Sequence, residues 1–379
     1  MKKFFLFATL VGVALTSCVK DELSQEAMQQ QEITFAAPVV TPSTKAVNEV
    51  GTDYTNGLSF GVWGFYYANG YDAFANGVEY MPGNATGAIT AGGLEISDNS
   101  GVWKNATNTY YWPKNGSLTF NAYAPYSEAS HASVTAKGIQ FTDYDVTSTA
   151  NVDLLYSERI EDKTANDNTG KEGVDVVFKH ALSSIRFAVK TADTYTGTTI
   201  TLTGITLKNV YSVADFNQGL TDAADAETPE LEIDGTGALV KDGTAYKNFL
   251  WSGWATQTDY SVASIYSGGV VTATPVYVHN GTATATENVS DLILLPQDLT
   301  NVVLSVDYTI TNPGGTVIEQ NGTISLYGND GVEDGQTDRI IHAWERGKRY
   351  TYTISIGLTE IKFDPTVTPW VDITVGGSI

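Results

Sequence analysis

Short segments in which apolar and polar residues alternate restrict the fold of this chain more than any other feature of its sequence. Residues 58–67 show the pattern, because Leu, Phe and Val fall on one face while Trp, Phe and Tyr fall on the other. Similar segments recur at 118–120, 174–178, 185–189, 200–207, 304–310 and 350–356. Clusters of Gly, Asn, Asp and Ser separate them, and the period of a helix is nearly absent. The sequence therefore predicts an all-β chain of β-sandwich type, with a bulge at Gly204.

The length of 379 residues fits one large all-β domain or, better, two domains. Apolar residues make up 42% of the chain and charged residues only 17%, so the chain can form real cores. Residues 191–197 separate two strand-rich halves. We therefore predict one domain at 32–191 and a second at 192–379, related in architecture and not by a sequence repeat.

The charge and cysteine content exclude several classes of function. Lys and Arg number 21 against 43 Asp and Glu, which gives a net charge of −22. Such a chain has no basic surface to neutralise phosphates, so we expect no nucleic-acid partner. One cysteine cannot form an internal disulfide, and the four histidines are not spaced as zinc ligands. The sequence predicts neither a metal nor a cofactor.

The N-terminus carries the pattern of an exported lipoprotein. Lys2 and Lys3 precede an apolar stretch at 4–16, which is shorter than the ~20 residues that span a bilayer. Residues 1–17 are thus predicted to be a signal peptide. The sequence Leu-Thr-Ser-Cys then matches a bacterial lipobox, in which Cys18, the sole cysteine, takes the lipid. A plain cleavage site with a chance cysteine is the alternative.

A polar segment follows the predicted lipid site. Lys20, Asp21 and Glu22 resemble the surface-export signal of Bacteroidetes lipoproteins, although a solvated charge cluster would look the same. The Gln-rich remainder of 18–31 is predicted to be a flexible tether to the outer membrane.

No pattern of catalytic residues stands out. The sequence has no G-x-S-x-G motif, and both His180 and His342 are more typical of structural histidines than of catalysts. Paired carboxylates for glycoside hydrolysis remain conceivable among the 43 acidic residues. Calcium ligands are the less favoured interpretation of two groups of acidic residues, at 328–338 and at Asp143, Asp145 and Asp153.

Aromatic residues are numerous and allow two interpretations. The chain has 7 Trp and 21 Tyr, which suit either a sugar-binding face or the packing of cores and sheet faces. The tryptophans are Trp63, Trp103, Trp112, Trp251, Trp254, Trp344 and Trp370. Core packing is the simpler interpretation of these residues.

Several short segments, in a fixed order, carry a resemblance that none of them would support alone. They are Glu32–Phe35, Thr44–Ala46, Tyr110–Pro113, Leu118–Pro125, Phe178–Ser183, and the run Trp344, Gly347, Lys348, Tyr350 and Tyr352 before Trp370. Together they resemble the fimbrillin family of Bacteroidetes type V pili, in its Mfa-like branch, over nearly the whole chain.

The resemblance implies a specific fold and a specific route of assembly. It implies two tandem transthyretin-like β-sandwich domains, export as a lipoprotein, and proteolytic removal of an N-terminal strand. Family members often carry Arg before the Ala of the cleavage loop, whereas this chain has Lys45 before Ala46. A strictly Arg-specific protease would not cut here, and one that accepts Lys would.

Two segments would carry the strand exchange that the resemblance implies. Ile33 and Phe35 lie in the first strand of a removable segment at 32–45, whose departure would expose a groove. An ordinary first strand that stays in place is the alternative. At the other end, Val367, Val371, Ile373 and Val375 share one face of a predicted donor strand. Their burial would contribute about 6–12 kcal/mol, although this strand could instead complete its own sheet. Pro365 and Pro369 indicate an edge or a bend.

The sequence therefore predicts a non-enzymatic structural subunit of a cell-surface fimbrium. Its expected partners are other copies or related subunits, the outer membrane, a maturation protease, and a host protein or glycan. A monomeric surface lipoprotein that binds glycans through exposed aromatic residues is the alternative, and a hydrolase is a third, less favoured one.

Overall fold

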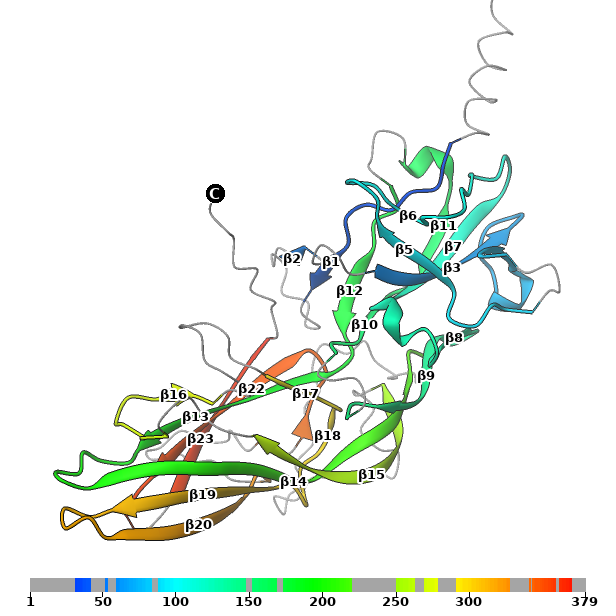
Figure 1. The fold of residues 1–379 in the computed structure, drawn as a ribbon. Coiled ribbons are helices and arrows are strands. Elements are labelled where there is room, and N and C mark those ends of the chain that lie inside the picture. The colour runs from blue at the N-terminus through cyan, green and yellow to red at the C-terminus, as the bar shows by residue number, and fades with distance from the viewer. Residues whose placement is uncertain are drawn as a thin grey trace, which may run out of the picture.

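The structure of the chain is a computed structural model, and the regular secondary structure of its described residues is almost entirely β-strand (Figure 1). It describes residues 31–41, 52–53, 59–83, 88–147, 152–168, 173–219, 250–262, 269–278, 291–327, 341, 343–358 and 361–369, with backbone alone at 52–53, 261–262 and 363–369. Its helices in these ranges are short 3-10 turns: η1 (Phe74–Asn76), η2 (Tyr126–Glu128) and η3 (Ala165–Asn168). None of the helices in these ranges could cross a membrane. The prediction of an all-β chain is confirmed.

The first lobe, which occupies the upper part of Figure 1, is one ten-stranded sheet. Its strands are β1 (Val39–Thr41), β2 (Thr52–Asp53), β3 (Ser59–Tyr67), β4 (Val78–Met81), β5 (Leu94–Asp98), β6 (Trp103–Lys104), β7 (Ser117–Ala124), β10 (Leu155–Ser157), β11 (Ile160–Lys163) and β12 (Val177–His180). The main path runs β2-β1-β12-β10-β7-β3-β5-β6, with β4 and β11 paired beside it. The first and last strands of the lobe thus share one sheet.

The second lobe contains three sheets. The six-stranded sheet consists of β8 (Ala132–Thr135), β9 (Gly138–Asp145), β14 (Thr199–Asn217), β15 (Trp251–Val262), β19 (Val303–Thr311) and β20 (Val317–Ser325). The five-stranded sheet consists of β13 (Ser183–Thr191), β16 (Val276–Tyr277), β17 (Leu292–Leu294), β22 (Lys348–Ile356) and β23 (Ile361–Pro369). A small ladder joins β18 (Gln297–Asp298) to β21 (Ala343–Trp344).

Strand β3 supplies side chains to two separate cores. Phe60 and Val62 belong to the core enclosed by the first lobe, whereas Trp63 and Phe65 belong to a larger core. The larger core continues into the second lobe, where it includes Leu202 of β14. The alternation predicted at 58–67 is therefore confirmed, and each face of this strand is buried by a different layer.

The sheets divide the chain at a different point from the predicted boundary. Strand β13, which ends at Thr191, pairs with β16, β17 and β22, so it belongs to the second lobe. The β8–β9 hairpin also joins that lobe, because β9 pairs with β14. A boundary between 191 and 192 would separate these strands from their partners. By sheet membership the chain makes its last passage from the first lobe to the second between β12 and β13, near residues 181–182.

Two local predictions in the second lobe are confirmed. The pairing of β14 with β19 shifts register between Leu202 and Gly204, where the sequence predicted a bulge. Strand β23 pairs with β22 and lies at the end of its sheet path, so Pro365 and Pro369 occupy an edge strand. Edge strands tolerate proline because one side of their backbone needs no partner.

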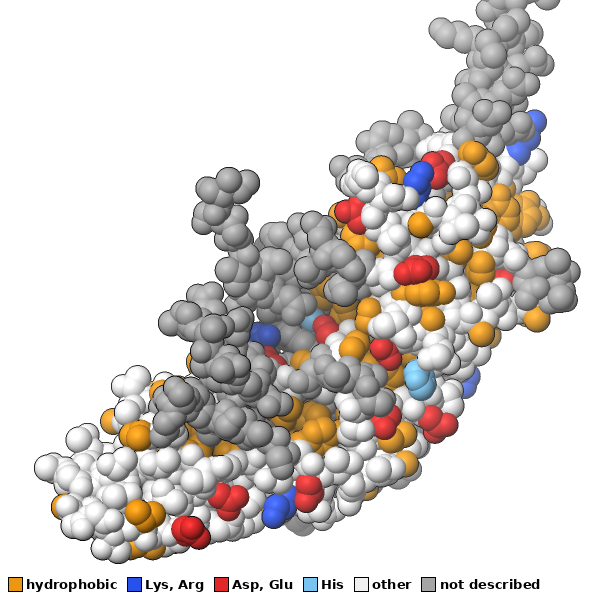
Figure 2. All heavy atoms as spheres, viewed as in Figure 1, with side chains coloured by type: hydrophobic (Ala, Val, Ile, Leu, Met, Phe, Trp, Pro, Cys, Tyr) orange, Lys and Arg blue, Asp and Glu red, His pale blue; other side chains and the backbone are white. Residues whose placement is uncertain are grey.

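Charged side chains are scattered over the visible face and form no single patch (Figure 2). Acidic residues lie singly on both lobes, between neutral and apolar side chains. This distribution fits the low content of charged residues, 17% of the chain. The net negative charge thus favours solubility and marks no docking site on this face.

Candidate functional site

The first segment of the described chain, residues 31–41, is the candidate functional site because it is paired along both of its sides. On one side it meets residues 103–112 through main-chain hydrogen bonds: Ile33 N to Tyr110 O (2.8 Å), Phe35 N to Trp103 O (2.9 Å) and Trp112 N to Gln31 O (3.0 Å). On this side the two backbones run antiparallel.

The opposite side of the first segment pairs with residues 174–179. The contacts begin with hydrogen bonds near the middle of the segment: Val174 N to Thr34 O (2.8 Å), Ala36 N to Val174 O (3.0 Å) and Val39 N to Val176 O (3.2 Å). They continue as β1, which is parallel to β12. In Figure 1 the dark blue segment accordingly runs down beside β12.

The first segment closes the sheet of the first lobe into a ring. Phe35 is bridged to Trp103 of β6 and to Val174, which precedes β12. Among the described strands, β6 and β12 are otherwise connected through β10, β7, β3 and β5. Without residues 31–41, both β6 and the start of β12 would present unpaired backbone groups. We call the position between them the first-strand slot.

Side chains of the first segment complete the core of the first lobe. Ile33 is 3% exposed and Phe35 only 1%. The Phe35 ring meets Phe60 and Phe120 edge-on, with centroids 5.5 and 5.6 Å apart. Val40 is buried further along the segment. Removing these residues would expose an aromatic cavity.

A glycine allows the backbone of the first segment to lie close to its neighbour. A Cβ atom on Gly173 would lie 2.5 Å from both the carbonyl carbon and the oxygen of Thr34. Real side chains do not tolerate such a contact, so the slot depends on glycine at this position. The sequence pattern gave no signal for this role of Gly173.

An ion pair fixes the outer edge of the slot. Glu32 accepts from the Lys104 ammonium on β6, with Nζ 3.0 Å from Oε1, and each side chain is 31% exposed. The pair was not predicted, although Glu32 directly precedes the alternating apolar residues and therefore faces outward. A half-exposed ion pair of this kind contributes little to stability, and its main effect is to fix the register of the first segment.

Two tyrosines support the strand that faces the first segment. The Tyr80 hydroxyl donates to Tyr111 O at 2.5 Å, and the Tyr110 hydroxyl donates to Pro82 O at 3.1 Å. Burial raises the pKa of both phenols, and for Tyr110 the nearby Glu79 raises the pKa further. Both groups therefore stay protonated and keep donating at neutral pH.

Most of the other predicted site residues lie outside the described residues. These are Cys18, Lys20, Asp21, Glu22, Lys45, Ala46, Val371, Ile373 and Val375. Val367 is different, because its backbone lies in β23 and pairs with Tyr350 of the same chain. Its assignment to a donor strand is therefore corrected: in this structure Val367 completes its own sheet.

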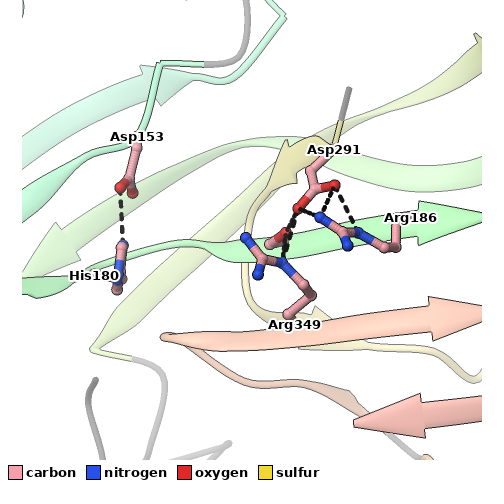
Figure 3. Close-up of polar contacts among 6 residues, drawn as sticks. Asp153, His180, Arg186, Asp291 and Arg349 are labelled. Carbon is pink, nitrogen blue, oxygen red and sulfur yellow. Dashed lines mark hydrogen bonds and ion pairs between the residues drawn. The ribbon is translucent and has the colours of Figure 1, made fainter. Parts of the chain in front are cut away.

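Polar contacts fix the position of the segment that connects the two lobes (Figure 3). His180, at the end of β12, lies with Nδ1 2.8 Å from Oδ2 of Asp153. Beyond it, Asp291 accepts from Arg186 of β13 at 2.8 and 3.0 Å and from Arg349 of β22 at 2.9 Å. Side chains with these partners are positioned for structure, as expected for His180.

The six tryptophans that the structure describes do not form an exposed sugar-binding face. Five of them are at most 4% exposed: Trp63, Trp103, Trp112, Trp251 and Trp344. Trp254 is half-buried and donates to Pro296 O at 3.1 Å, while Trp370 lies outside the described residues. Core packing, the simpler interpretation of the sequence, is therefore confirmed for the buried five.

Comparison with known proteins gives the chain its family. A family model described as fimbrillin-like, of the Mfa-like group, matches residues 44–370. A fimbrial protein of Bacteroides vulgatus has a similar structure, with 16% identity, a TM-score of 0.51, and 90% of this chain and 99% of that one covered. A fimbrilin of Porphyromonas gingivalis covers 90% of this chain and 98% of its own, at 10% identity and a TM-score of 0.37. No curated protein matches.

The match agrees with the order of segments in the sequence and extends over most of both lobes. It also confirms the expectation of a structural protein in place of an enzyme. The chain belongs to the fimbrillin-like family.

Proposed function

We propose that this protein is a structural subunit of a cell-surface fimbrium and that it polymerises by strand exchange. It is exported as a lipoprotein through Cys18 with the Lys20-Asp21-Glu22 signal, and cut after Lys45. The observation that carries the proposal is the pairing of residues 31–41 along both sides, inside a core. Removal of a strand so placed leaves a slot that fits another strand.

The energetics of the first segment explain why a cut alone would not empty the slot. Burial of Ile33, Phe35 and Val40 stabilises the segment by about 4.5–9 kcal/mol, at about 1.5–3 kcal/mol each. Cleavage removes the covalent tether, so the segment no longer rebinds at high local concentration. An incoming strand that stays tethered to its own subunit can then replace it.

The proposal includes the organisation of the whole chain. The lobes correspond to two tandem transthyretin-like sandwiches, and the donor strand follows β23, with Val371, Ile373 and Val375 as its core face. The pairing of Val367 within its own sheet supports a donor that begins after Pro369. The assembled subunits stand on the outer membrane and support adhesion to a host protein or glycan.

Blocking the cut tests the proposal. In a Lys45→Gln variant, trypsin-like cleavage at this position is lost and the protein should remain monomeric after protease treatment. The Lys45→Arg variant is the matched control, because it keeps a cleavable basic residue and should form filaments like the wild type. Electron microscopy detects filaments, and mass spectrometry of the new N-terminus verifies the cut.

Two results would contradict the proposal. One is filament formation by uncut Lys45→Gln protein at the wild-type rate. The other is cut wild-type protein that stays monomeric at high concentration, with residues 31–41 retained in the slot. Deletion of residues 371–379 is a further test. The shortened protein should fold and be cut, but it should form no filaments.

A further inference from the structure

Strand β20 is the least protected sheet edge in the described part of the chain. Among the described strands it pairs with β19 alone, and it forms the lower border of the second lobe in Figure 1. Its ladder with β19 runs over nine residue pairs without a register shift. The segment 317–325 contains no proline and no basic residue, and Glu319 is its one charged residue. An open edge of this kind is a template for another strand.

The other edges that the structure describes carry the protections that β20 lacks. Strand β23 contains Pro365 and Pro369, and the ladder of β15 has two register shifts. The remaining strands at the ends of the sheet paths, β2, β6, β8 and β16, have two to four residues. Short strands, bulges and proline are the usual means by which proteins prevent pairing at an edge. A long edge without them indicates a surface that pairs with another strand.

The core face of β20 is incompletely covered. Ile318 lies directly opposite Ile310, a residue of the larger core, so both side chains point to the core face of the sheet. Ile310 is 6% exposed, whereas Ile318 is 40% exposed. The facing sheet reaches β20 at Gly322, where the Ile361 side chain occupies the space that a Cβ atom would need. The apolar face thus extends past its cover at Ile318, and a further strand beside β20 would bury this side chain.

The low charge of β20 favours a second copy of the chain as its partner. Each chain carries a net charge of −22, so two copies repel each other over most of their surfaces. The residues of β20 on the core face, at 318, 320, 322 and 324, are all uncharged. A contact between two β20 strands therefore brings only one carboxylate from each copy into the interface.

The sequence of β20 is also complementary to itself. Asn321 is the middle residue of the strand, so two antiparallel copies related by a two-fold axis at Asn321 pair over their whole length. In this register Ile318 of each copy lies opposite Ile324 of the other, and both are on the core face. Glu319 lies opposite Thr323, so the two carboxylates are kept apart.

Neighbouring registers fit less well, and each of them shortens the ladder. An axis at residue 320 would set Ile318 opposite Gly322, which has no side chain to cover it. An axis at 319 would set Ile318 opposite Gln320 and place the two Glu319 carboxylates directly opposite each other, which is destabilising. An axis at 322 would move the partner of Ile318 beyond the end of the strand.

We propose that β20 is an interaction surface for a second copy of this chain, which it meets edge to edge through an antiparallel ladder centred on Asn321. Nine residues on each side are fewer than the roughly 20–30 of a stable interface, so two single subunits associate weakly. Along a fimbrium the contact is repeated, and many weak contacts together hold two filaments side by side. This bundling rests on the proposed function, whereas the dimer of uncut chains does not.

A cysteine in the middle of β20 measures the contact and its register. In a chain whose native Cys18 is replaced by serine, Asn321→Cys places two thiols opposite each other at the axis, within disulfide reach. Glu319→Cys and Thr323→Cys are the matched controls, because both side chains are exposed on the same face as Asn321. In the proposed register each lies four residues, about 14 Å, from its counterpart along the strand.

The cross-linking is measured on uncut protein under mild oxidation, with a non-reducing gel as the readout. The 321 variant should form a covalent dimer several-fold faster than either control. The double variant Glu319→Cys with Thr323→Cys should also cross-link fast, because these two positions lie opposite each other across the axis.

Sedimentation of uncut protein without added cysteines gives a second readout. Ile318→Lys places an ammonium against Ile324 of the partner and should weaken self-association roughly tenfold. Ile318 is 40% exposed, so the substitution should leave the fold intact. Val78→Lys is the matched control, because this valine of β4 is 66% exposed in the first lobe, and it should leave self-association unchanged. Circular dichroism verifies the fold of both variants.

The outcomes separate this contact from the fimbrial function. Fastest cross-linking at 321, together with weaker self-association of Ile318→Lys, supports the proposal. Fastest cross-linking at 319 or 323 overturns the register. Equally slow cross-linking at all three positions overturns the contact and assigns the edge to a strand of another protein. Because the chain stays uncut throughout, the fimbrial function stands in each case and fails only in the test on Lys45.

Discussion

The first segment and the last strand of the described chain are held in opposite ways. Residues 31–41 are paired on both sides and bury Ile33 and Phe35 in the core of the first lobe. Strand β23 pairs on one side with β22, through a continuous antiparallel ladder, and lies at the edge of its sheet. The first segment closes the sheet of the first lobe, whereas β23 forms an edge of its own sheet.

This difference indicates which segment gains most from replacement by another strand and which segment does not. Loss of a strand that is paired on both sides opens two edges and a core, so a replacement gains both hydrogen bonds and burial. Loss of an edge strand such as β23 would expose only one new edge, because it pairs with a single neighbour, β22. The asymmetry fits a subunit that gives up its first segment and offers its last residues.

Truncating Phe35 should have the largest effect on the uncut protein. Phe35→Ala removes a ring packed against Phe60 and Phe120 and should lower the free energy of unfolding by about 3–5 kcal/mol. Urea denaturation of uncut protein measures the loss. The same substitution should leave assembled filaments unchanged, because residue 35 is no longer part of them.

The control for Phe35→Ala is Val177→Ala on β12, whose side chain is 43% exposed. It should change stability by no more than about 0.5 kcal/mol. If Phe35→Ala weakened filaments as much as the uncut monomer, the first segment would still be in its slot, and the contrast between the two ends would fail.

Removing Asp291 should have the next largest effect, and it concerns the last strand. Arg349 of β22, the strand that pairs with β23, and Arg186 of β13 both donate to this carboxylate. Asp291→Ala leaves both guanidinium groups without it and should cost about 2–3 kcal/mol in urea denaturation. The closure of the first lobe should be unaffected, as hydrogen exchange at Ile33 and Phe35 would report.

Glu158→Ala provides the comparison for Asp291. Glu158 also pairs with a cation, Lys179 at 2.6 Å, but its side chain is 64% exposed, so the expected cost is below about 1 kcal/mol. Equal losses from the two substitutions would mean that burial does not distinguish the pairs.

The sequence predicted the structure within single strands better than the pairing of strands that are distant in the chain. Alternation at 58–67 identified both faces of β3, and Gly204 identified a bulge, because these signals lie within single strands. Strand β13 was placed in the wrong half, since its parallel partner β22 lies more than 150 residues away. Periodicity contains no information on such distant pairing.

The candidate site was predicted in part for the same reason. The burial of Ile33 and Phe35 follows from their own alternation. Lys104 and Gly173 were missed, because each is defined by a segment that is remote in sequence and adjacent in space. Val367 was assigned to the donor because its apolar face resembles one, whereas its pairing with Tyr350 depends on the sheet.

Substitution of Glu345 should have the smallest effect on stability, and this effect should be confined to the region around β22, the strand that pairs with β23. It precedes β22, and its main-chain N–H donates to the Tyr350 hydroxyl at 2.9 Å. Burial raises the pKa of the Glu345 carboxyl, while Lys348 and Arg346 lower it in part. The folded protein therefore keeps this proton at pH values where the unfolded chain has lost it. The resulting stability is present below the ordinary pKa and is lost as pH rises through the raised pKa.

Glu345→Gln tests this dependence, because glutamine stays neutral at every pH. The variant should match the wild type in stability near pH 4 and exceed it at pH 7, as urea denaturation across that range would show. A stability difference that stays constant with pH would contradict the assignment. A pH-dependent difference confined to the second lobe would show that the two ends respond independently, so a rise in pH can loosen the support of β23 without opening the slot.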